Sequence, residues 1–160
     1  MYRGEARPEV VEGWIREMEK IFDMIQCSET EKVNLATYTL QGRAEEWWRS
    51  AKRNTFGNQP EVTWEVFLVE FNKKFFSEQM KAKLETEFLQ LQQGFMTVSQ
   101  YEIRFSELLK YAPYYGEDEL RKTRRFVQGL RGPIKDRVSL FHHTAMAEAY
   151  AVACTAEENL

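Results

Sequence analysis

A run of basic residues near position 130 carries the clearest side-chain chemistry in the sequence. Between positions 121 and 137 there are seven cations and one acid, Asp136, so this span has a charge of +6 and the rest of the chain carries −9 to give the net charge of −3. Guanidinium and ammonium groups can contact RNA phosphates or an acidic face of a neighbouring subunit. The candidate contact residues are Arg121, Lys122, Arg124, Arg125, Arg131, Lys135 and Arg137.

Helical spacing places three of these cations, Arg121, Arg124 and Arg125, on one helix face. The alternative interpretation is a solvated face that balances nearby acids. No aromatic stacking platform interleaves the run, so sequence-specific RNA readout is not expected. The negative net charge also argues against a dedicated nucleic-acid binder.

Metal and catalytic chemistry finds no support in the sequence. His142 and His143 are adjacent, and Cys27 and Cys154 are remote from them, which matches no zinc-ligand spacing. A glycine-rich phosphate loop and a nucleophile elbow are both absent. We therefore predict a non-enzymatic protein with no metal, no cofactor and no small-molecule substrate, whose two thiols stay reduced.

Composition indicates one ordinary domain or two small ones. The 160 residues are 43% apolar and 29% charged, which excludes a disordered chain. No apolar run reaches the ~18 residues of a membrane span, and the first ten residues lack the apolar core of a signal peptide. We expect a cytoplasmic protein that binds no membrane.

Apolar residues at helical spacing predict four helices in the first half of the chain. Residues 1–7 are expected to fray, and a polar breaker is expected at 54–60. The helices should start at Pro8, Ser28 (a capping box with Glu31), after Gly42, and at Thr63. Their apolar positions include Val11, Trp14, Ile15, Met18, Phe22, Ile25; Val33, Ala36, Leu40; Ala44, Trp47, Trp48, Ala51; and Trp64, Phe67, Leu68, Phe71, Phe75.

A helical hairpin is predicted in the second half. Gly94 should end one helix in a left-handed C-cap, and Thr97 should start the next in a capping box with Gln100. Backbone groups of the turn are expected to hold the polar Gln93. Val98, Tyr101, Phe105, Leu108 and Leu109 then form the buried face of the second helix.

Further helices should flank this hairpin. One starts at Ser77, and another follows a turn at 114–116, with Leu120, Phe126, Val127 and Leu130 apolar and Gly129 near its end. A short helix opens at Gly132 with Ile134, Val138 and Phe141 apolar, and Thr144 caps a last one that reaches about Glu158. With no strand pattern, we predict an all-α fold of about nine short helices in two lobes.

Four segments in fixed order carry a family resemblance. They are LATYTLQGRAEEWW at 35–48, TWEVFLVEFNKKFF at 63–76, LQLQQGFMTVSQYEIRFSELLKYAP at 89–113 and FVQGLRGPIKDRV at 126–138. The set resembles the capsid region of Gag from gypsy-type long-terminal-repeat retrotransposons, over about residues 9–158. The motif and core residues are Trp14, Leu40, Gly42, Ala44, Trp47, Trp48, Trp64, Phe67, Phe71, Phe75, Gln93, Gly94, Tyr101, Phe105, Leu108, Phe126, Gly129 and Leu130. The 93–108 part also resembles the major homology region of retroviral capsids, without its usual acidic and arginine pair.

The resemblance implies a bilobed α-helical capsid subunit that self-associates into particles around element RNA. It implies an N-terminal lobe at 1–76 and a C-terminal lobe at 77–160, with the chain itself as partner and RNA bound weakly through the basic run. Neither a zinc knuckle nor the Asp-Thr/Ser-Gly of a retroviral-type protease occurs in the sequence. The alternatives are a domesticated adaptor with a peptide groove near Trp14, Trp47 and Trp64, and an RNA-binding helical module. Core packing is the preferred interpretation of Trp47, Trp48 and the phenylalanine stripe.

Overall fold

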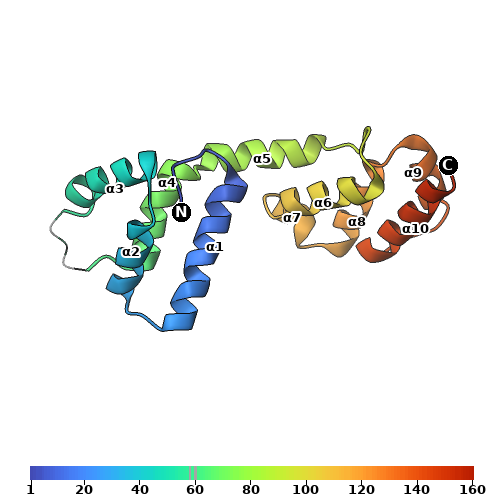
Figure 1. Cartoon of the computed structure of the whole chain (residues 1–160). Coiled ribbons are helices and arrows are strands. Elements are labelled where there is room, and N and C mark those ends of the chain that lie inside the picture. The colour runs from blue at the N-terminus through green and yellow to red at the C-terminus, as the bar shows by residue number, and fades with distance from the viewer. Residues whose placement is uncertain (58, 60) are drawn as a thin grey trace. The chain divides into compact units, whose positions relative to one another are not determined.

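The computed structural model describes residues 1–57, 59 and 61–160, which form ten helices and no strand (Figure 1). The predicted all-α class is confirmed for this described part. Asn58 and Pro60, in the expected breaker at 54–60, lie outside the described residues. The chain divides into two compact units, Met1–Met80 and Lys81–Leu160. The sequence placed the boundary at 76/77, and the assignment of the two units as capsid lobes stays a prediction.

Unit 1 contains α1 (Pro8–Ile25), α2 (Glu29–Tyr38), α3 (Gly42–Asn54) and α4 (Trp64–Phe75). Pro8 occupies the first turn of α1, where its missing N–H costs nothing. Both bonds of the Ser28–Glu31 capping box are present at α2, and Thr63 caps α4 by accepting from the Val66 N–H, as predicted. Gly42 begins α3 rather than ending α2, which already stops at Tyr38.

The core of unit 1 is built mainly from aromatic rings. Phe71 lies at its centre, with ring centroids 5.0 Å from Trp14 and 5.6 Å from Phe67. Ile25, predicted on the apolar stripe of α1, is instead 51% exposed because it is the last residue of the helix. The buried apolar residues are Tyr2, Val11, Trp14, Met18, Phe22, Val33, Ala36, Leu40, Ala44, Ala51, Phe56, Trp64, Phe67, Phe71, Phe75 and Phe76.

The expectation that residues 1–7 fray is wrong. Tyr2 is fully buried, its backbone forms an isolated parallel bridge with Leu40, and its carbonyl accepts the Gln41 N–H at 2.8 Å. A single aromatic residue beside a turn gives no helical or strand period, so the sequence pattern did not reveal this contact.

The remaining helices are α5 (Glu78–Gln90), α6 (Val98–Leu109), α7 (Pro113–Gly116), α8 (Glu119–Gln128), α9 (Gly132–Val138) and α10 (Met146–Glu158). The division between the units falls inside α5. The predicted Ser77 cap is present, since its Oγ accepts the Met80 N–H at 3.3 Å. The short α7 is the helix that the sequence prediction interpreted as a turn, and it brings the described total to ten rather than nine.

Three predicted helix ends in unit 2 are wrong. Gly94 has φ +55° but lies in the turn, because α5 already ends at Gln90. Thr144 does not cap α10, whose first N–H, on Met146, donates instead to Glu119 Oε1 at 2.9 Å. Phe141 is 67% exposed because α9 stops at Val138.

The core of unit 2 gathers around α6 and α8, with α10 packed against α6, α8 and α9. Tyr101 and Phe126 stack at 5.0 Å between ring centroids, and Phe105 meets Phe126 edge-on. The buried apolar set is Phe88, Val98, Tyr101, Phe105, Leu108, Ala112, Phe126, Leu130, Ile134, Val138, Ala149, Ala153 and Ala156.

Candidate functional site

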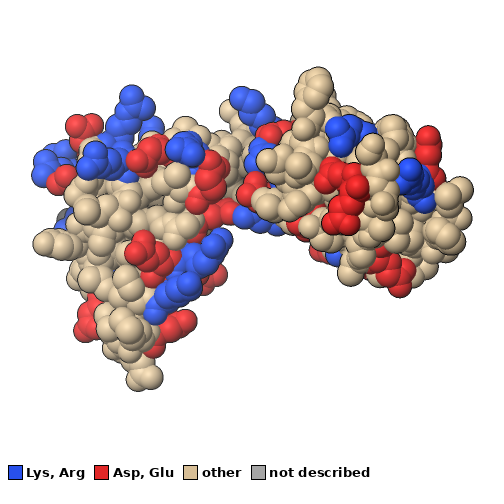
Figure 2. Space-filling view, turned by 45° about the vertical axis from the view of Figure 1, so that its right-hand side comes forward, with Lys and Arg blue, Asp and Glu red and all other residues tan. Residues whose placement is uncertain are grey.

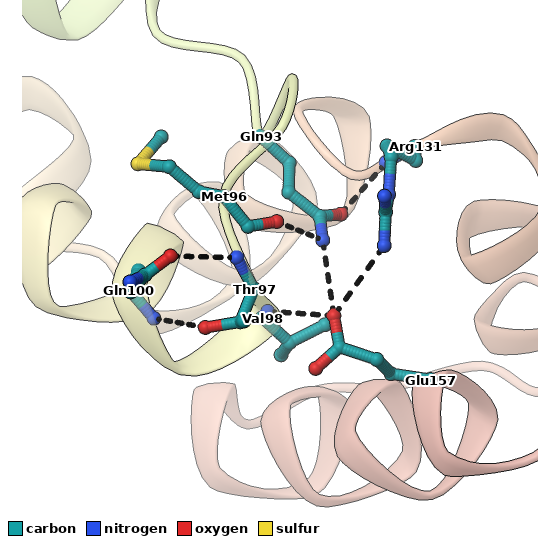
Figure 3. A network of polar contacts seen from close by, with 7 residues as sticks. All are labelled: Gln93, Met96, Thr97, Val98, Gln100, Arg131 and Glu157. Atoms are coloured by element: carbon teal, nitrogen blue, oxygen red, sulfur yellow. Dashed lines mark hydrogen bonds and ion pairs between the residues drawn. The ribbon is translucent and has the colours of Figure 1, made fainter.

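The turn between α5 and α6 is fixed by the buried side chain of Gln93, which is 1% exposed (Figure 3). Its backbone N–H donates to the Gly129 carbonyl at 2.7 Å. Its amide nitrogen donates to the Met96 carbonyl at 2.9 Å, and its amide oxygen accepts the Arg131 N–H at 2.9 Å. Backbone groups therefore satisfy both ends of the amide, which is what a buried polar group requires.

A carboxylate from α10 completes this network. Glu157 Oε2 accepts the Val98 N–H at 2.9 Å and the Gln93 amide at 3.4 Å, and it pairs with the Arg131 guanidinium at 3.5 Å (Figure 3). Beside it, Thr97 and Gln100 form both bonds of the predicted capping box at the start of α6. One negative group at a helix N-terminus thus ties α6, the start of α9 and α10 together.

Tyr101 links the hairpin to the end of α8. Its hydroxyl donates to the Phe126 carbonyl at 2.9 Å, and burial raises the pKa of this hydroxyl well above its ordinary value, so it stays a neutral donor. A Cβ at Gly129 would overlap the Tyr101 hydroxyl oxygen. Four residues of the sequence motif that are separated along the chain therefore lie together here in unit 2: Gln93, Tyr101, Phe126 and Gly129.

Arg125 corrects the prediction for the basic run. It is buried at 7% exposure, and its Nη2 donates to the carbonyls of Phe88, Leu89 and Leu91 at 3.2, 2.9 and 2.8 Å. A cation among the last carbonyls of α5 is favoured by the helix dipole. Arg125 therefore caps a helix and does not share an exposed face with its predicted neighbours.

Three more cations of the run have partners within unit 2. Arg121 lies over the Tyr114 ring at 4.2 Å and 3.8 Å from Asp118. Lys122 pairs with Glu119 at 2.6 Å, and Arg131 pairs with Glu157 as above. In the described part of the chain, no ion pair is formed by the last three, Arg124, Lys135 and Arg137.

On the face shown in Figure 2, the surface charge is mixed rather than gathered into one basic stripe. Lys and Arg side chains lie there among Asp and Glu side chains in both units (Figure 2). Of the predicted seven-residue patch, Arg125 is buried and three cations are ion-paired, which leaves three exposed or half-exposed cations without an ion pair in the described part of the chain.

The predicted tryptophan groove is not formed by all three of its rings. Trp14 and Trp64 are 3% and 8% exposed and belong to the core, with indole N–H groups donating to Thr39 Oγ1 and Glu19 Oε1. Trp47 is half-buried and packs edge-on against Phe67. It also lines an open hollow of about 650 Å³ with Gly4, Ala6, Arg43, Glu46, Ser50, Lys74, Phe75 and Met80.

An apolar surface lies at the end of α1 and along α2. Tyr38 is 88% exposed and Ile25 51% exposed, and both line a shallow hollow of about 470 Å³. We call this surface the α1–α2 patch, made of Ile25, Cys27, Glu31, Asn34, Leu35 and Tyr38. Sequence reasoning missed it because Ile25 continues the apolar stripe of α1, and Tyr38 lies outside the apolar positions predicted for α2.

A second hollow, of about 280 Å³, lies between α8 and the segment after α9. It places the exposed ring of Phe141 near Arg124, one of the cations without an ion pair. We call it the α8–α9 hollow, lined by Thr123, Arg124, Val127, Gln128, Val138, Ser139, Phe141, His142 and His143. The sequence put Phe141 in the core, so an aromatic group beside the basic run was not expected.

The described residues contain neither a candidate metal site nor a membrane-spanning helix. No three His, Cys, Asp or Glu side chains there gather in a way that could hold a metal ion. Within the same part, every helix is too short or too polar to cross a membrane. Cys27 and Cys154 are both unpaired and half-buried.

Comparison with known proteins gives one match, in the first half of the chain. One family model, described as "Retrotransposon-derived protein PEG10, N-terminal capsid-like domain", matches residues 1–76. No curated protein and no solved structure matches the chain. The resemblance to retrotransposon Gag capsids is thus confirmed over the span that α1 to α4 occupy, while a C-terminal capsid lobe at 77–160 stays a prediction. Residues 1–76 are therefore similar to a retrotransposon-derived, capsid-like N-terminal domain.

Proposed function

We propose that this protein is a non-enzymatic capsid-type subunit that self-associates into shells around RNA. The family match of residues 1–76 carries the proposal, because the name of the matched domain is that of a capsid-like unit of retrotransposon origin. The two compact helical units agree with it, since a bilobed subunit can present separate surfaces to different neighbours. We propose the cytoplasm as the place where such particles form.

The α1–α2 patch supports self-association. Large exposed apolar side chains rimmed by polar groups mark surfaces that contact another protein. Here Tyr38 and Ile25 are the exposed apolar residues, and Glu31 and Asn34 supply the rim. Burying such a patch in a multivalent shell needs little affinity per contact, because each subunit makes several contacts at once.

The α8–α9 hollow supports a weak RNA contact. Arg124 supplies a guanidinium that forms no ion pair with a carboxylate of the described residues, and the exposed Phe141 ring offers a stacking surface. Three cations without ion pairs would give a modest, salt-dependent affinity with no sequence preference. This is the behaviour expected of a shell that packages RNA without reading it.

A second candidate, an adaptor that binds a partner peptide, is favoured by the Trp47 hollow. In that hollow the half-exposed indole of Trp47 could contact an apolar side chain of a peptide. Arg43 and Lys74 could pair with an acidic residue beside it. An adaptor would stay monomeric at every concentration and would bind its peptide in that state.

The proposal is tested by charging the α1–α2 patch. We expect Ile25→Glu combined with Tyr38→Glu to abolish oligomers in mass photometry, because an apolar contact would then have to bury two carboxylates. Val69→Glu, at a 52% exposed position on α4, is the matched control and should assemble like the parent. Equal assembly of all three proteins would remove the patch from the contact.

A further inference from the structure

The segment that precedes α1 is the strongest feature that the proposed function leaves unused. We call residues 1–5 the strap. The surface of unit 1 that receives it is called the slot and is formed by Trp14, Leu40, Gln41, Phe71 and Phe75. The Tyr2 ring enters the slot with centroids 5.8 Å from Trp14, 5.5 Å from Phe71 and 5.3 Å from Phe75. Burial, and after it the charge of Glu5, raises the pKa of the Tyr2 hydroxyl well above its ordinary value.

Main-chain contacts hold the strap as an added strand would be held. The Tyr2 carbonyl accepts the Gln41 N–H at 2.8 Å, and the backbone pairs in parallel with Leu40. The Gln41 side-chain amide also contacts Met1 Sδ at 2.7 Å. Such bonds recognise an extended backbone with one aromatic anchor and do not depend on which copy of the chain supplies it.

Gly4 lets the strap pass close to α3. It has φ +93°, and a Cβ there would lie 2.8 Å from Arg43 Cβ and 3.3 Å from the Phe75 ring. Only glycine fits this approach without displacing a neighbour. The strap is therefore shaped to the slot along its backbone as well as at the tyrosine.

The link between the strap and α1 is exposed. Within the strap, the Tyr2 hydroxyl donates to the Glu5 carbonyl at 2.7 Å and the Arg3 N–H donates to the Glu5 carboxylate at 3.2 Å. Ala6 and Arg7, which follow, are both exposed before α1 begins at Pro8. Rotation at these two residues can carry the strap away as one piece, with its internal bonds kept.

We infer that the strap is an exchangeable element that can fill the slot of a second copy of this chain. Exchange preserves every strap–slot contact, so its cost is confined to the hinge and to bringing two copies together. That second cost falls when copies are concentrated in an assembly. The inference rests on the proposed self-association and gives it a partner surface, the slot of the adjacent subunit.

Two chains with one cysteine each test the exchange. In a background of Cys27→Ser and Cys154→Ser, one chain carries Arg3→Cys and the other Gly42→Cys. A Cβ at Gly42 lies 3.9 Å from Arg3 Cβ, within the range for a disulfide. Because neither chain can form the bond alone, a mixed disulfide reports a strap of one copy docked on the other.

The mixture is oxidised at assembling concentration and analysed by mass spectrometry and mass photometry. We expect the mixed dimer to exceed that from a control pair, Arg3→Cys with Val69→Cys at an exposed position outside the α1–α2 patch, by about tenfold, because docking raises the local concentration of the two thiols. Equal yields from both pairs while particles form would overturn the exchange and leave the proposed function standing. Absence of any oligomer would overturn both, and mixed dimers without particles would support exchange and contradict the shell.

Gly42 has φ +55°, so its cysteine variant is checked by its thermal unfolding. If that variant does not fold, a second experiment is used instead. The photo-crosslinking residue benzoylphenylalanine is placed at position 3, and isotopically light and heavy chains are mixed. Crosslinks that join light to heavy chains at the slot support exchange. Crosslinks confined to single chains overturn it.

Discussion

The two units hold their cores together in different ways. In unit 1 the buried side chains of the described residues are all apolar, and aromatic rings dominate the centre. Unit 2 contains three buried polar or charged residues, Gln93, Thr123 and Arg125, each hydrogen-bonded to backbone carbonyls or amides. The hydrophobic burial of apolar side chains is non-directional, whereas these hydrogen bonds are satisfied in one arrangement only. We therefore expect the core of unit 1 to tolerate the replacement of one apolar side chain by another. In unit 2, we expect the hydrogen bonds to fix how the helices are aligned against one another.

One device is common to both units. Glu29 at the start of α2 pairs with Lys32 and accepts the first N–H of α4, from Trp64 at 3.0 Å. Glu119 at the start of α8 pairs with Lys122 and accepts the first N–H of α10, as described above. In each unit a carboxylate on one helix thus docks the N-terminus of another, whatever the chemistry of the core.

The largest expected effect is the loss of a central ring in unit 1. Phe71→Ala should lower the free energy of unfolding by about 3–5 kcal/mol, because it leaves a cavity among packed rings. All four tryptophans lie in unit 1, so urea unfolding followed by tryptophan fluorescence reports this unit. Val69→Ala, on the exposed side of the same helix, should change the transition little; equal effects would break the picture of a ring-built core.

In unit 2 the sharpest comparison is between two neighbouring arginines. Arg125→Met should cost about 1.5–3 kcal/mol, since it removes charged hydrogen bonds and leaves buried carbonyls of α5 without a donor. Arg124→Met removes the same group from an exposed position and should cost little. Hydrogen exchange of α5 and α8 measures both. Equal protection in the two variants would show that the buried guanidinium contributes nothing.

These two arginines show where sequence reasoning stops. The bonds that the pattern predicted are local, such as the Ser28–Glu31 and Thr97–Gln100 boxes, whose partners lie three residues apart. The pattern could not separate Arg124 from Arg125, because the carbonyls that Arg125 caps lie 34 to 37 residues away in the chain.

The same limit explains the missed surfaces. The docking of Tyr2 against α4 and the exposure of Phe141 both follow from tertiary packing, which overrides residue type and local spacing. Gly94 has the left-handed backbone that its residue type favours, yet the helix before it ends earlier. Residue type thus indicated the conformation, while the packing around the turn fixed its place.

A smaller effect is expected where the motif of unit 2 closes. Gly129→Ala should destabilise unit 2 by about 1–3 kcal/mol, because the added methyl collides with the Tyr101 hydroxyl and ring. Combining it with Tyr101→Phe removes the hydroxyl and should recover part of the loss. The stability of the parent, the single variant and the double variant is measured by thermal unfolding and by hydrogen exchange of α6. If the double variant is no better than Gly129→Ala, the collision is not the cause.

The smallest effects come from the shared carboxylate device. Lys32, and after it the Trp64 N–H, hold the pKa of Glu29 below its ordinary 4.5; Lys122, and after it the Met146 N–H, do the same for Glu119. Because the folded-state pKa values are lowered, their stabilisation is present above pH 4.5 and is lost as the pH falls through the lowered values. Glu29→Gln should therefore make the stability of unit 1, followed by tryptophan fluorescence, less dependent on pH in the acid range. It should leave the pH dependence of unit 2 unchanged.

Glu119→Gln should make the stability of unit 2 alone less dependent on pH in the acid range. Hydrogen exchange of α10 measures this stability. The amide of each variant still accepts the helix N–H, so the difference isolates the charge. A variant that alters the acid limb of the other unit, or of neither, would contradict the parallel between them.

The central claim, that this chain is a self-associating capsid-type subunit, is tested most directly by mass photometry and negative-stain imaging of one purified sample. The measurement covers a range of protein and salt concentrations. We predict oligomers that grow with protein concentration and closed particles in the images. A chain that stays monomeric at high concentration in every salt would contradict the claim.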